Sequence, residues 1–362
     1  TEIFEAFHAM ASAFPDLPLV GQRFAWGHQR IVTALMARRP NFYVEFSRYQ
    51  INRALEVYAR RFGVERLLFG SGAPALSAGA ARAFVDYADL DDDAKRLIAG
   101  GNLRRLLGVQ PKPCQPPAEN ASDSLLALAR RGQPLLDSPV LDAHCHVLAP
   151  GSHGGANVVA YQGDAAGIVQ LASRLGTQAT AMMSWSGPLG GDMTGGNDVV
   201  YQAMRQFPDK VIGVAYVNPS HHTPAELEAE MRLRVDEQGF LALKPYMNTG
   251  VPYADPLWEP VWRFGAQRGL YALFHLDAGG IESIKRIAAA FPGLDCVVAH
   301  SGGNWNMARN VAGAMRDLPN IWAEITLTTV TLGAVEHLAQ QGDENRVLYG
   351  TDWDVEADAF SG

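Results

Sequence analysis

The chain has 362 residues, a formal net charge of −8 and a hydrophobic content of 48%. This length suits one large barrel with an appendage, and the apolar fraction can supply a sizeable core. The negative charge argues against a nucleic-acid partner, because phosphate binding needs a basic face. The sequence contains neither an apolar run of membrane-spanning length nor an N-terminal secretory signal, so we expect a cytoplasmic protein with no membrane partner.

The first predicted elements are short strands near 17–22, 42–46 and 66–69, followed by a helix over 91–99. Three sequence blocks around these strands recur in the same order about 280 residues later. The matched blocks are 13–17 with 290–294, 40–45 with 319–324, and 66–71 with 346–351. Residues 1–108 are therefore predicted to be a partial repeat of the C-terminal part of the following domain.

A proline-rich linker is predicted over 109–135, since 109–117 alone contains four prolines. Proline fixes φ and blocks both helix and central strand, so an extended spacer is expected. The chain starts at Thr1 rather than Met and reaches Gly362 without a closing helix. Both ends are therefore expected to be cut from something longer.

The main domain, predicted over 136–362, alternates apolar strands with helices such as 224–237 and 281–290. The strands are expected at 140–146, 179–184, 211–217, 242–245, 271–275, 296–300, 321–325 and 347–349. Eight strands separated by helices indicate the α/β class and a (β/α)8 barrel of the TIM type. A doubly wound sheet is the alternative that periodicity alone leaves open.

Two histidines, His144 and His146, lie at the end of the first barrel strand. Residues two apart on a strand share a face, so both imidazoles should project to the same side. Such a pair is a poor choice for packing and a good chelate for a metal ion. A structural pair of histidines is the alternative.

Three further polar residues, His275, His300 and Asp352, each follow a later apolar strand. All strands of a parallel barrel end on the same face, so these side chains should converge with the first two histidines. Nitrogen and carboxylate donors without thiolate suit zinc, manganese, iron or cobalt. Asp352 could orient a water and move its proton, and His300 could polarise a carbonyl or act as an acid.

Other residues near strand ends are candidates for substrate binding. Lys244 ends the fourth strand, and Trp185, Tyr246 and Trp305 lie close to other strand ends. Glu324 could also line the pocket. For the aromatic residues, plain packing is the alternative.

Four motifs, at 142–146, 274–275, 299–303 and 349–352, together resemble the amidohydrolase superfamily, in particular its amidohydrolase 2 branch. That branch includes aminocarboxymuconate-semialdehyde decarboxylase and pyrone-dicarboxylate lactonase. The resemblance covers most of 136–356. It implies a barrel enzyme whose C-terminal face holds the active site.

The resemblance also implies one divalent metal ion, with zinc favoured and manganese, iron or cobalt open. Its implied ligands are His144, His146, His275 and Asp352. His300 is then a catalytic or accessory histidine. In dinuclear members of the superfamily a lysine in the place of Lys244 is carbamylated, but in this branch a substrate or structural role is favoured.

The function predicted from this resemblance is hydrolysis of an amide, lactone or related ester bond of a small metabolite through a metal-activated water. Non-oxidative decarboxylation of a small aromatic or unsaturated acid is the alternative, because the same ligand set serves both reactions. A degenerate binding or scaffold protein is a third possibility, since the partial repeat has Gly72 where Asp352 stands and Arg23 or a neighbour where His300 stands. The expected partners are a small-molecule substrate and, as an open possibility, further copies of the chain.

Overall fold

The computed structural model describes residues 2–110, 125, 127–128, 131–135, 137–152, 159–246, 249–326 and 330–352. The chain divides into two compact units. The first, called the N-terminal unit, comprises residues 1–138, 155–161 and 355–362, and the second, the barrel unit, comprises residues 139–154 and 162–354. Most of the predicted linker lies outside the described residues. No described helix is long and apolar enough to span a membrane.

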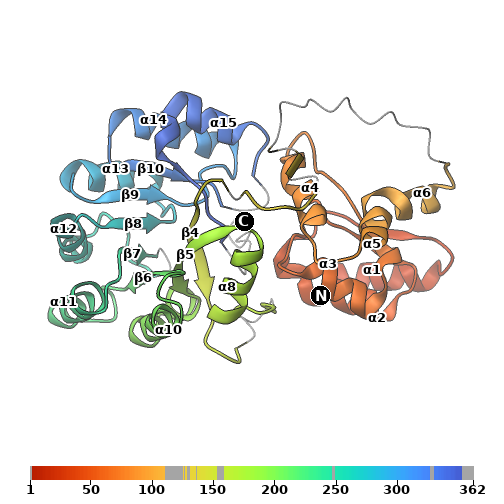
Figure 1. The fold of residues 1–362 in the computed structure, drawn as a ribbon, viewed down its shortest axis with the longest axis horizontal. Helices are drawn as coiled ribbons and strands as arrows, with labels where there is room; N and C mark the ends of the chain where they lie inside the picture. The colour runs from red at the N-terminus through yellow and green to blue at the C-terminus, as the bar shows by residue number, and fades with distance from the viewer. Residues whose placement is uncertain are drawn as a thin grey trace. The chain divides into compact units, whose positions relative to one another are not determined.

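The barrel unit is built on eight parallel strands. They are β4 (Val140–Val147), β5 (Thr177–Ser184), β6 (Val211–Val217), β7 (Ala242–Pro245), β8 (Tyr271–Phe274), β9 (Asp295–Val298), β10 (Ile321–Glu324) and β11 (Val347–Leu348). Each strand pairs in parallel with its neighbours in sequence, from β4 to β11 (Figure 1). This order confirms the predicted barrel and excludes the doubly wound sheet, whose strand order reverses part-way.

The chain segment after β11 joins the last strand to the first. The Ala143 amide donates to the Tyr349 carbonyl at 2.9 Å, and the Asp352 amide donates to the His144 carbonyl at 2.7 Å. These hydrogen bonds close the ring of strands beside the ends of β4 and β11. Residues about 200 positions apart in sequence are thereby fixed next to each other.

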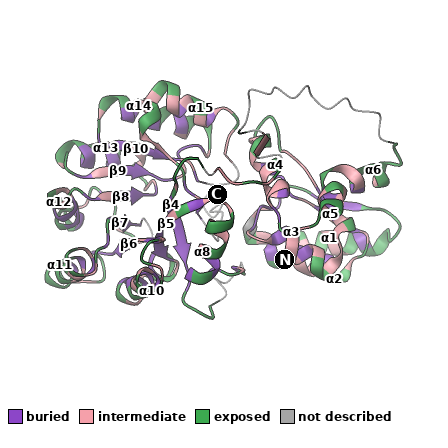
Figure 2. Ribbon diagram, viewed as in Figure 1, coloured by how far each residue is buried: buried purple, intermediate pink, exposed green. Residues whose placement is uncertain are grey.

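Helices between the strands form the outer layer of the barrel unit (Figure 1). They are α8 (Ala165–Arg174), α9 (Ser186–Gly190), α10 (Met193–Gln206), α11 (Pro224–Arg232), η4 (Leu233–Glu237), η6 (Pro256–Trp258), α12 (Glu259–Arg268), α13 (Gly280–Ala290), α14 (Trp305–Asp317), α15 (Ala334–Leu338), η7 (Ala339–Asp343) and η8 (Glu344–Arg346). Local sequence sets their starts: Thr223 and Glu226 form a capping box at α11. In Figure 2 the strands are mostly buried, while these helices are exposed on their outer faces.

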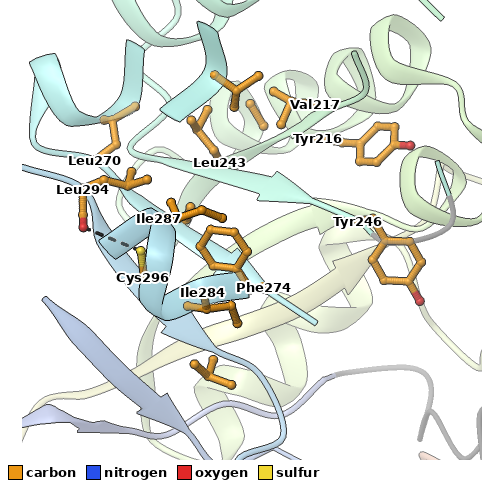
Figure 3. Close-up of a cluster of buried hydrophobic side chains, with 14 of the residues drawn as sticks. Tyr216, Val217, Leu243, Tyr246, Leu270, Phe274, Ile284, Ile287, Leu294 and Cys296 are labelled. Carbon is orange, nitrogen blue, oxygen red and sulfur yellow. Dashed lines mark hydrogen bonds between the residues drawn. The ribbon is translucent and has the colours of Figure 1, made fainter. Parts of the chain in front are cut away.

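Side chains that alternate along the strands form two apolar layers. The inner layer, within the ring, consists of Ala181, Met183, Val214, Ala242, Leu273, Val297 and Ala299. The outer layer packs against the helices, and Figure 3 shows Phe274 of β8 beside Ile284 and Ile287 of α13. This alternation fixes which strand residues point into the ring.

The N-terminal unit contains a three-stranded parallel sheet, with β1 (Leu19–Gly21), β2 (Phe42–Glu45) and β3 (Leu67–Leu68) in that order. Its helices are α1 (Glu2–Ala13), η1 (Trp26–His28), α2 (Gln29–Arg38), α3 (Ala54–Phe62), η2 (Val64–Arg66), α4 (Ala78–Asp86), α5 (Asp92–Arg96), η3 (Leu97–Gly101) and α6 (Asn102–Leu107). Three strands are too few to close a barrel. The helix predicted over 91–99 is split, because a π-helical turn begins at Leu97.

Candidate metal centre and active site

The five polar residues predicted at strand ends all lie at the C-terminal end of the barrel. His144 and His146 belong to β4, while His275, His300 and Asp352 follow β8, β9 and β11. His144 is fully buried, and His146, His275 and Asp352 are 6%, 8% and 4% exposed. The barrel therefore brings the predicted side chains to one face and removes them almost completely from water.

These side chains form one cluster, called the donor cluster. His144 Nε2 and His146 Nε2 each lie 3.2 Å from Asp352 Oδ1. His300 Nε2 lies 2.7 Å from His275 Nε2 and 3.9 Å from Asp352 Oδ2. In the described part of the chain, His144, His300 and Asp352 have potential ligand atoms that all lie within 4.8 Å of one another. His300, which the sequence suggested as a catalytic group, thus lies among the predicted ligands.

Two members of the cluster have a left-handed backbone. The φ angle is 59° at His300 and 48° at Asp352. Side chains other than glycine rarely adopt this conformation, and such strained residues concentrate at functional sites. The bend at His300 also explains why β9 ends at Val298, two residues before the predicted end of that strand.

The electrostatics of the cluster favour neutral imidazoles beside an ionised carboxylate. Burial, with Lys244 as a further cause, holds the pKa of His144 and His275 well below the ordinary value. Burial lowers the pKa of His300 to about 4, although Asp352 opposes this shift. Burial opposes ionisation of Asp352, but the hydrogen bond from His146 and the electrostatic effect of His300, His146 and Lys244 outweigh it, so its pKa is lowered.

This donor set fits a divalent metal ion. Neutral imidazole nitrogens and a carboxylate oxygen, without thiolate, are the ligands that zinc, manganese and similar ions take. The lowered pKa values of His144, His275 and Asp352 favour the protonation states that metal binding requires.

Lys244 lies inside the cluster rather than at its edge. Its side chain is fully buried, with Nζ 3.4 Å from His144 Nε2 and 3.2 Å from His275 Nδ1. Burial lowers the pKa of Lys244 to about 7, against the opposing effect of Asp352 and Glu324. The amine is therefore poised to change charge near neutral pH.

Two of the three predicted aromatic residues lie against the donor cluster. The Trp185 ring stands edge-on to His146, with centroids 5.2 Å apart, and the Tyr246 ring stands edge-on to His275 at 4.8 Å. Trp305 instead contacts His337 and is 39% exposed. Among the described ring contacts Trp305 has none with the cluster, so its predicted role in substrate binding stays a prediction.

Glu324 and Thr326 have a larger place in the site than the sequence suggested. Glu324 is fully buried, and its Oε2 lies 3.1 Å from His144 Nδ1. The Thr326 hydroxyl donates to Glu324 Oε2 at 2.9 Å and lies 2.6 Å from His300 Nδ1. The sequence suggested only a pocket-lining role for Glu324 and did not point to Thr326. A usable signal was the recurrence of glutamate in both repeat blocks, as Glu45 and Glu324.

Asp142 links β4 to the chain segment that follows β11. Its Oδ1 accepts from the His144 amide at 3.1 Å and from the Thr351 amide at 3.0 Å, and its Oδ2 accepts from the Thr351 hydroxyl at 2.6 Å. Burial raises the pKa of Asp142 to about 7, although these hydrogen bonds oppose the shift. Asp142 thus holds the two chain segments that carry His144 and Asp352.

Comparison with known proteins identifies the family. A family model described as Amidohydrolase matches residues 3–109 and 141–358, and no curated protein matches the sequence.

Similar solved structures include a 4-oxalomesaconate hydratase from Rhodopseudomonas palustris, at 18% identity over 62% of this chain and 83% of the hydratase, with a TM-score of 0.46. A probable 2-pyrone-4,6-dicarboxylic acid hydrolase from Acinetobacter baumannii has 13% identity over 62% of this chain and 88% of its own, with a TM-score of 0.44. A 5-carboxyvanillate decarboxylase from Novosphingobium aromaticivorans, in a structure that holds manganese, has 13% identity over 59% of this chain and 86% of its own, with a TM-score of 0.45. Because the family model matches most of its residues, this chain belongs to the amidohydrolase family of metal-dependent enzymes.

Proposed function

We propose that the barrel unit is a metal-dependent hydrolase that cleaves an amide, lactone or related ester bond of a small metabolite. The observation that carries this proposal is the position of His300 beside Asp352 within the donor cluster, with Nε2 3.9 Å from Oδ2. Hydrolysis needs a base and an acid that act on neighbouring atoms, and this pair supplies both. The proposed ligands of the metal, zinc in the first instance, are His144, His146, His275 and Asp352.

The hydrogen bonds of His300 define which of its nitrogens can act. The Thr326 hydroxyl donates its proton to Glu324, so its oxygen can only accept at His300 Nδ1. Neutral His300 therefore carries its proton on Nδ1, and its Nε2 can accept from His275 Nε2, which lies 2.7 Å away. A divalent ion, when bound, would lower the pKa of a water and polarise a carbonyl. Asp352 would take the proton of that water and transfer it to His300 Nε2. Protonated there, His300 would bind the carbonyl oxygen or pass the proton to the leaving group.

The rings of Trp185 and Tyr246 favour a flat or cyclic substrate. Both stand edge-on to predicted ligands, so they form apolar sides next to the polar centre. Proteins bind small molecules through apolar walls and a few placed polar groups. Lactones, cyclic amides and aromatic esters are therefore the first compounds to test.

Mass spectrometry of the products tests the reaction. The full chain, loaded with zinc or with manganese, is incubated with lactones, amides and esters and, separately, with aromatic acids. Products heavier by one water support hydrolysis, whereas loss of carbon dioxide would establish the decarboxylase alternative. If a fully metal-loaded protein converted none of these, the binding-protein alternative would gain support.

Two variants test the assigned residues. The double variant His144→Ala and His146→Ala should abolish metal content, and stoichiometric metal in that variant would refute the ligand assignment. His300→Asn should lower kcat by roughly 10²-fold or more, the range for an acid–base group, while its metal content stays near wild type. Unchanged turnover would show that His300 is structural.

We also propose that residues 1–108 are a partial, non-catalytic copy of the last part of the barrel. The strand register supports this proposal. Leu19 of β1 pairs with Phe42 of β2, and the matching pair in the barrel is Cys296 of β9 with Ile321 of β10. The next pairs correspond as well, Val44 with Leu67 and Ala323 with Val347.

Side-chain hydrogen bonds and backbone angles correspond in the same way. Asn41 Nδ2 donates to the carbonyls of Ala11, Phe14 and Leu17, as Asn320 Nδ2 does to those of Ala288, Phe291 and Leu294. Arg23 and Gly72, at the places of His300 and Asp352, have φ angles of 60° and 65°. Neither is a metal ligand, so we expect one metal ion per chain and none in the double variant that lacks His144 and His146.

A further inference from the structure

The side chain of Glu324 links two parts of the donor cluster. It lies at the end of β10, is fully buried, and uses both carboxylate oxygens. Oε1 accepts from the Thr326 amide at 2.5 Å. Oε2 accepts from the Thr326 hydroxyl and lies 3.1 Å from His144 Nδ1 and 3.3 Å from the His300 amide.

Glu324 Oε2 therefore contacts the groups that orient the imidazole rings of His144 and His300. On one side, Oε2 of an ionised carboxylate can only accept, so His144 Nδ1 is the donor and its Nε2 faces Asp352 at 3.2 Å. On the other side, Oε2 holds the His300 amide directly and the His300 ring through the Thr326 hydroxyl. Carboxylates behind a histidine ligand fix its tautomer and raise its basicity.

A glutamate in the N-terminal unit shows which contacts of Glu324 arise from the turn after the strand alone. There Glu45 Oε1 accepts from the Ser47 amide at 2.5 Å and Glu45 Oε2 accepts from the Ser47 hydroxyl at 2.8 Å. These two bonds repeat those between Glu324 and Thr326, at the end of a corresponding strand. The sequence blocks around Glu45 contain no counterpart of His144. The turn alone thus accounts for two of the bonds of Glu324, and the contacts with His144 and His300 are additional.

We infer that Glu324 is a positioning residue that fixes the predicted ligand His144 and the acid–base residue His300 through one shared oxygen. The role of His300 in this inference rests on the proposed function, whereas the effect on His144 concerns metal binding alone. Glu324→Gln keeps the shape of the side chain and can keep the acceptor for the Thr326 amide. It replaces Oε2 with an NH2 group, which cannot accept from either histidine.

The test compares Glu324→Gln with its matched control, Glu45→Gln, in the full chain. We expect Glu324→Gln to weaken zinc and cobalt binding by about 10- to 100-fold, the range found for such supporting carboxylates, and to change the visible spectrum of the cobalt-loaded protein. Glu45→Gln should leave both within about twofold of wild type, since no predicted ligand depends on it. Equal zinc affinity and equal cobalt spectra in the two variants would overturn the inference. Neither readout needs a substrate, so a failed search for hydrolysis would not affect this result.

A measurement on the wild-type protein covers the case in which Glu324→Gln does not fold. Two-dimensional proton–nitrogen spectra of the histidine rings report which nitrogen carries the proton. In the metal-free protein we expect His144 and His300 both to carry it on Nδ1, because Glu324 and Thr326 accept there. A proton on Nε2 of His144 would contradict the inference whatever the variant does.

Discussion

Replacement of Asp142 by alanine should destabilise the barrel unit, because this carboxylate holds the closing segment to β4. Its removal leaves the His144 amide buried without the acceptor at 3.1 Å, which costs about 1–3 kcal/mol. The bond from the Thr351 hydroxyl is lost as well, at about 1 kcal/mol or somewhat more. The Thr351 amide retains the His144 carbonyl as a partner at 3.2 Å, so it adds little. We expect a total of about 2–5 kcal/mol.

For a unit of roughly 200 residues, this loss corresponds to a fall in Tm of about 4–20 °C. Tryptophan fluorescence is the suitable probe, because only Trp26 of the seven tryptophans precedes the barrel unit. Asp142→Asn is the control: its amide oxygen can still accept from the two backbone amides, so a loss below about 1 kcal/mol is expected. If Asp142→Ala melted within about 2 °C of wild type, as its control should, the closing hydrogen bonds would not stabilise the barrel.

Three further predictions concern the donor cluster. Zinc at 100 times its Kd should stabilise the barrel unit by about 2.7 kcal/mol in thermal or denaturant unfolding, and the variant without His144 and His146 should show no such gain. Metal affinity should rise with pH up to about 7 and then level off. One cause is Lys244, whose pKa is about 7 rather than 10.5, because its amine is cationic below that pH and repels the ion. Calorimetric titrations of Lys244→Met at several pH values should show a weaker dependence of metal affinity on pH, and an unchanged dependence would exclude this cause. Gly350→Ala should lower the free energy of unfolding of the barrel by about 1–3 kcal/mol, because a Cβ atom would lie 2.6 Å from the carboxylate of Glu324. An unchanged free energy of unfolding would mean that this carboxylate can move.

The sequence was sufficient for the barrel because strand and helix periods differ and parallel strands need helical crossovers. The position of the donor cluster also followed from the sequence, since His144 and His146 alternate on one strand and all strands end on one face. Strand ends were less predictable: β9 stops at Val298 because His300 adopts a left-handed φ, which its residue type does not announce. The helix expected over 91–99 was interrupted for a similar local reason, the π-helical turn at Leu97.

The contacts behind the cluster could not be predicted. Glu324 meets His144 across 180 residues of chain, and that contact depends on the diameter of the closed ring rather than on local sequence. The ring contact of Trp305 could not be predicted either. Its place near a strand end predicts a substrate contact, which stays a prediction, and its ring lies against His337 of α15.

The left-handed backbone at His300 and Asp352 has a consequence for laboratory evolution. Each of these residues pays for its conformation with about 1–3 kcal/mol of folding stability, whereas glycine or asparagine would adopt the same φ with less strain. A library of variants sorted only for heat resistance should therefore enrich glycine or asparagine at these two positions. It would lose the side chains of His300 and Asp352 first. Thermostable versions of this protein need a screen that scores bound metal in the same round.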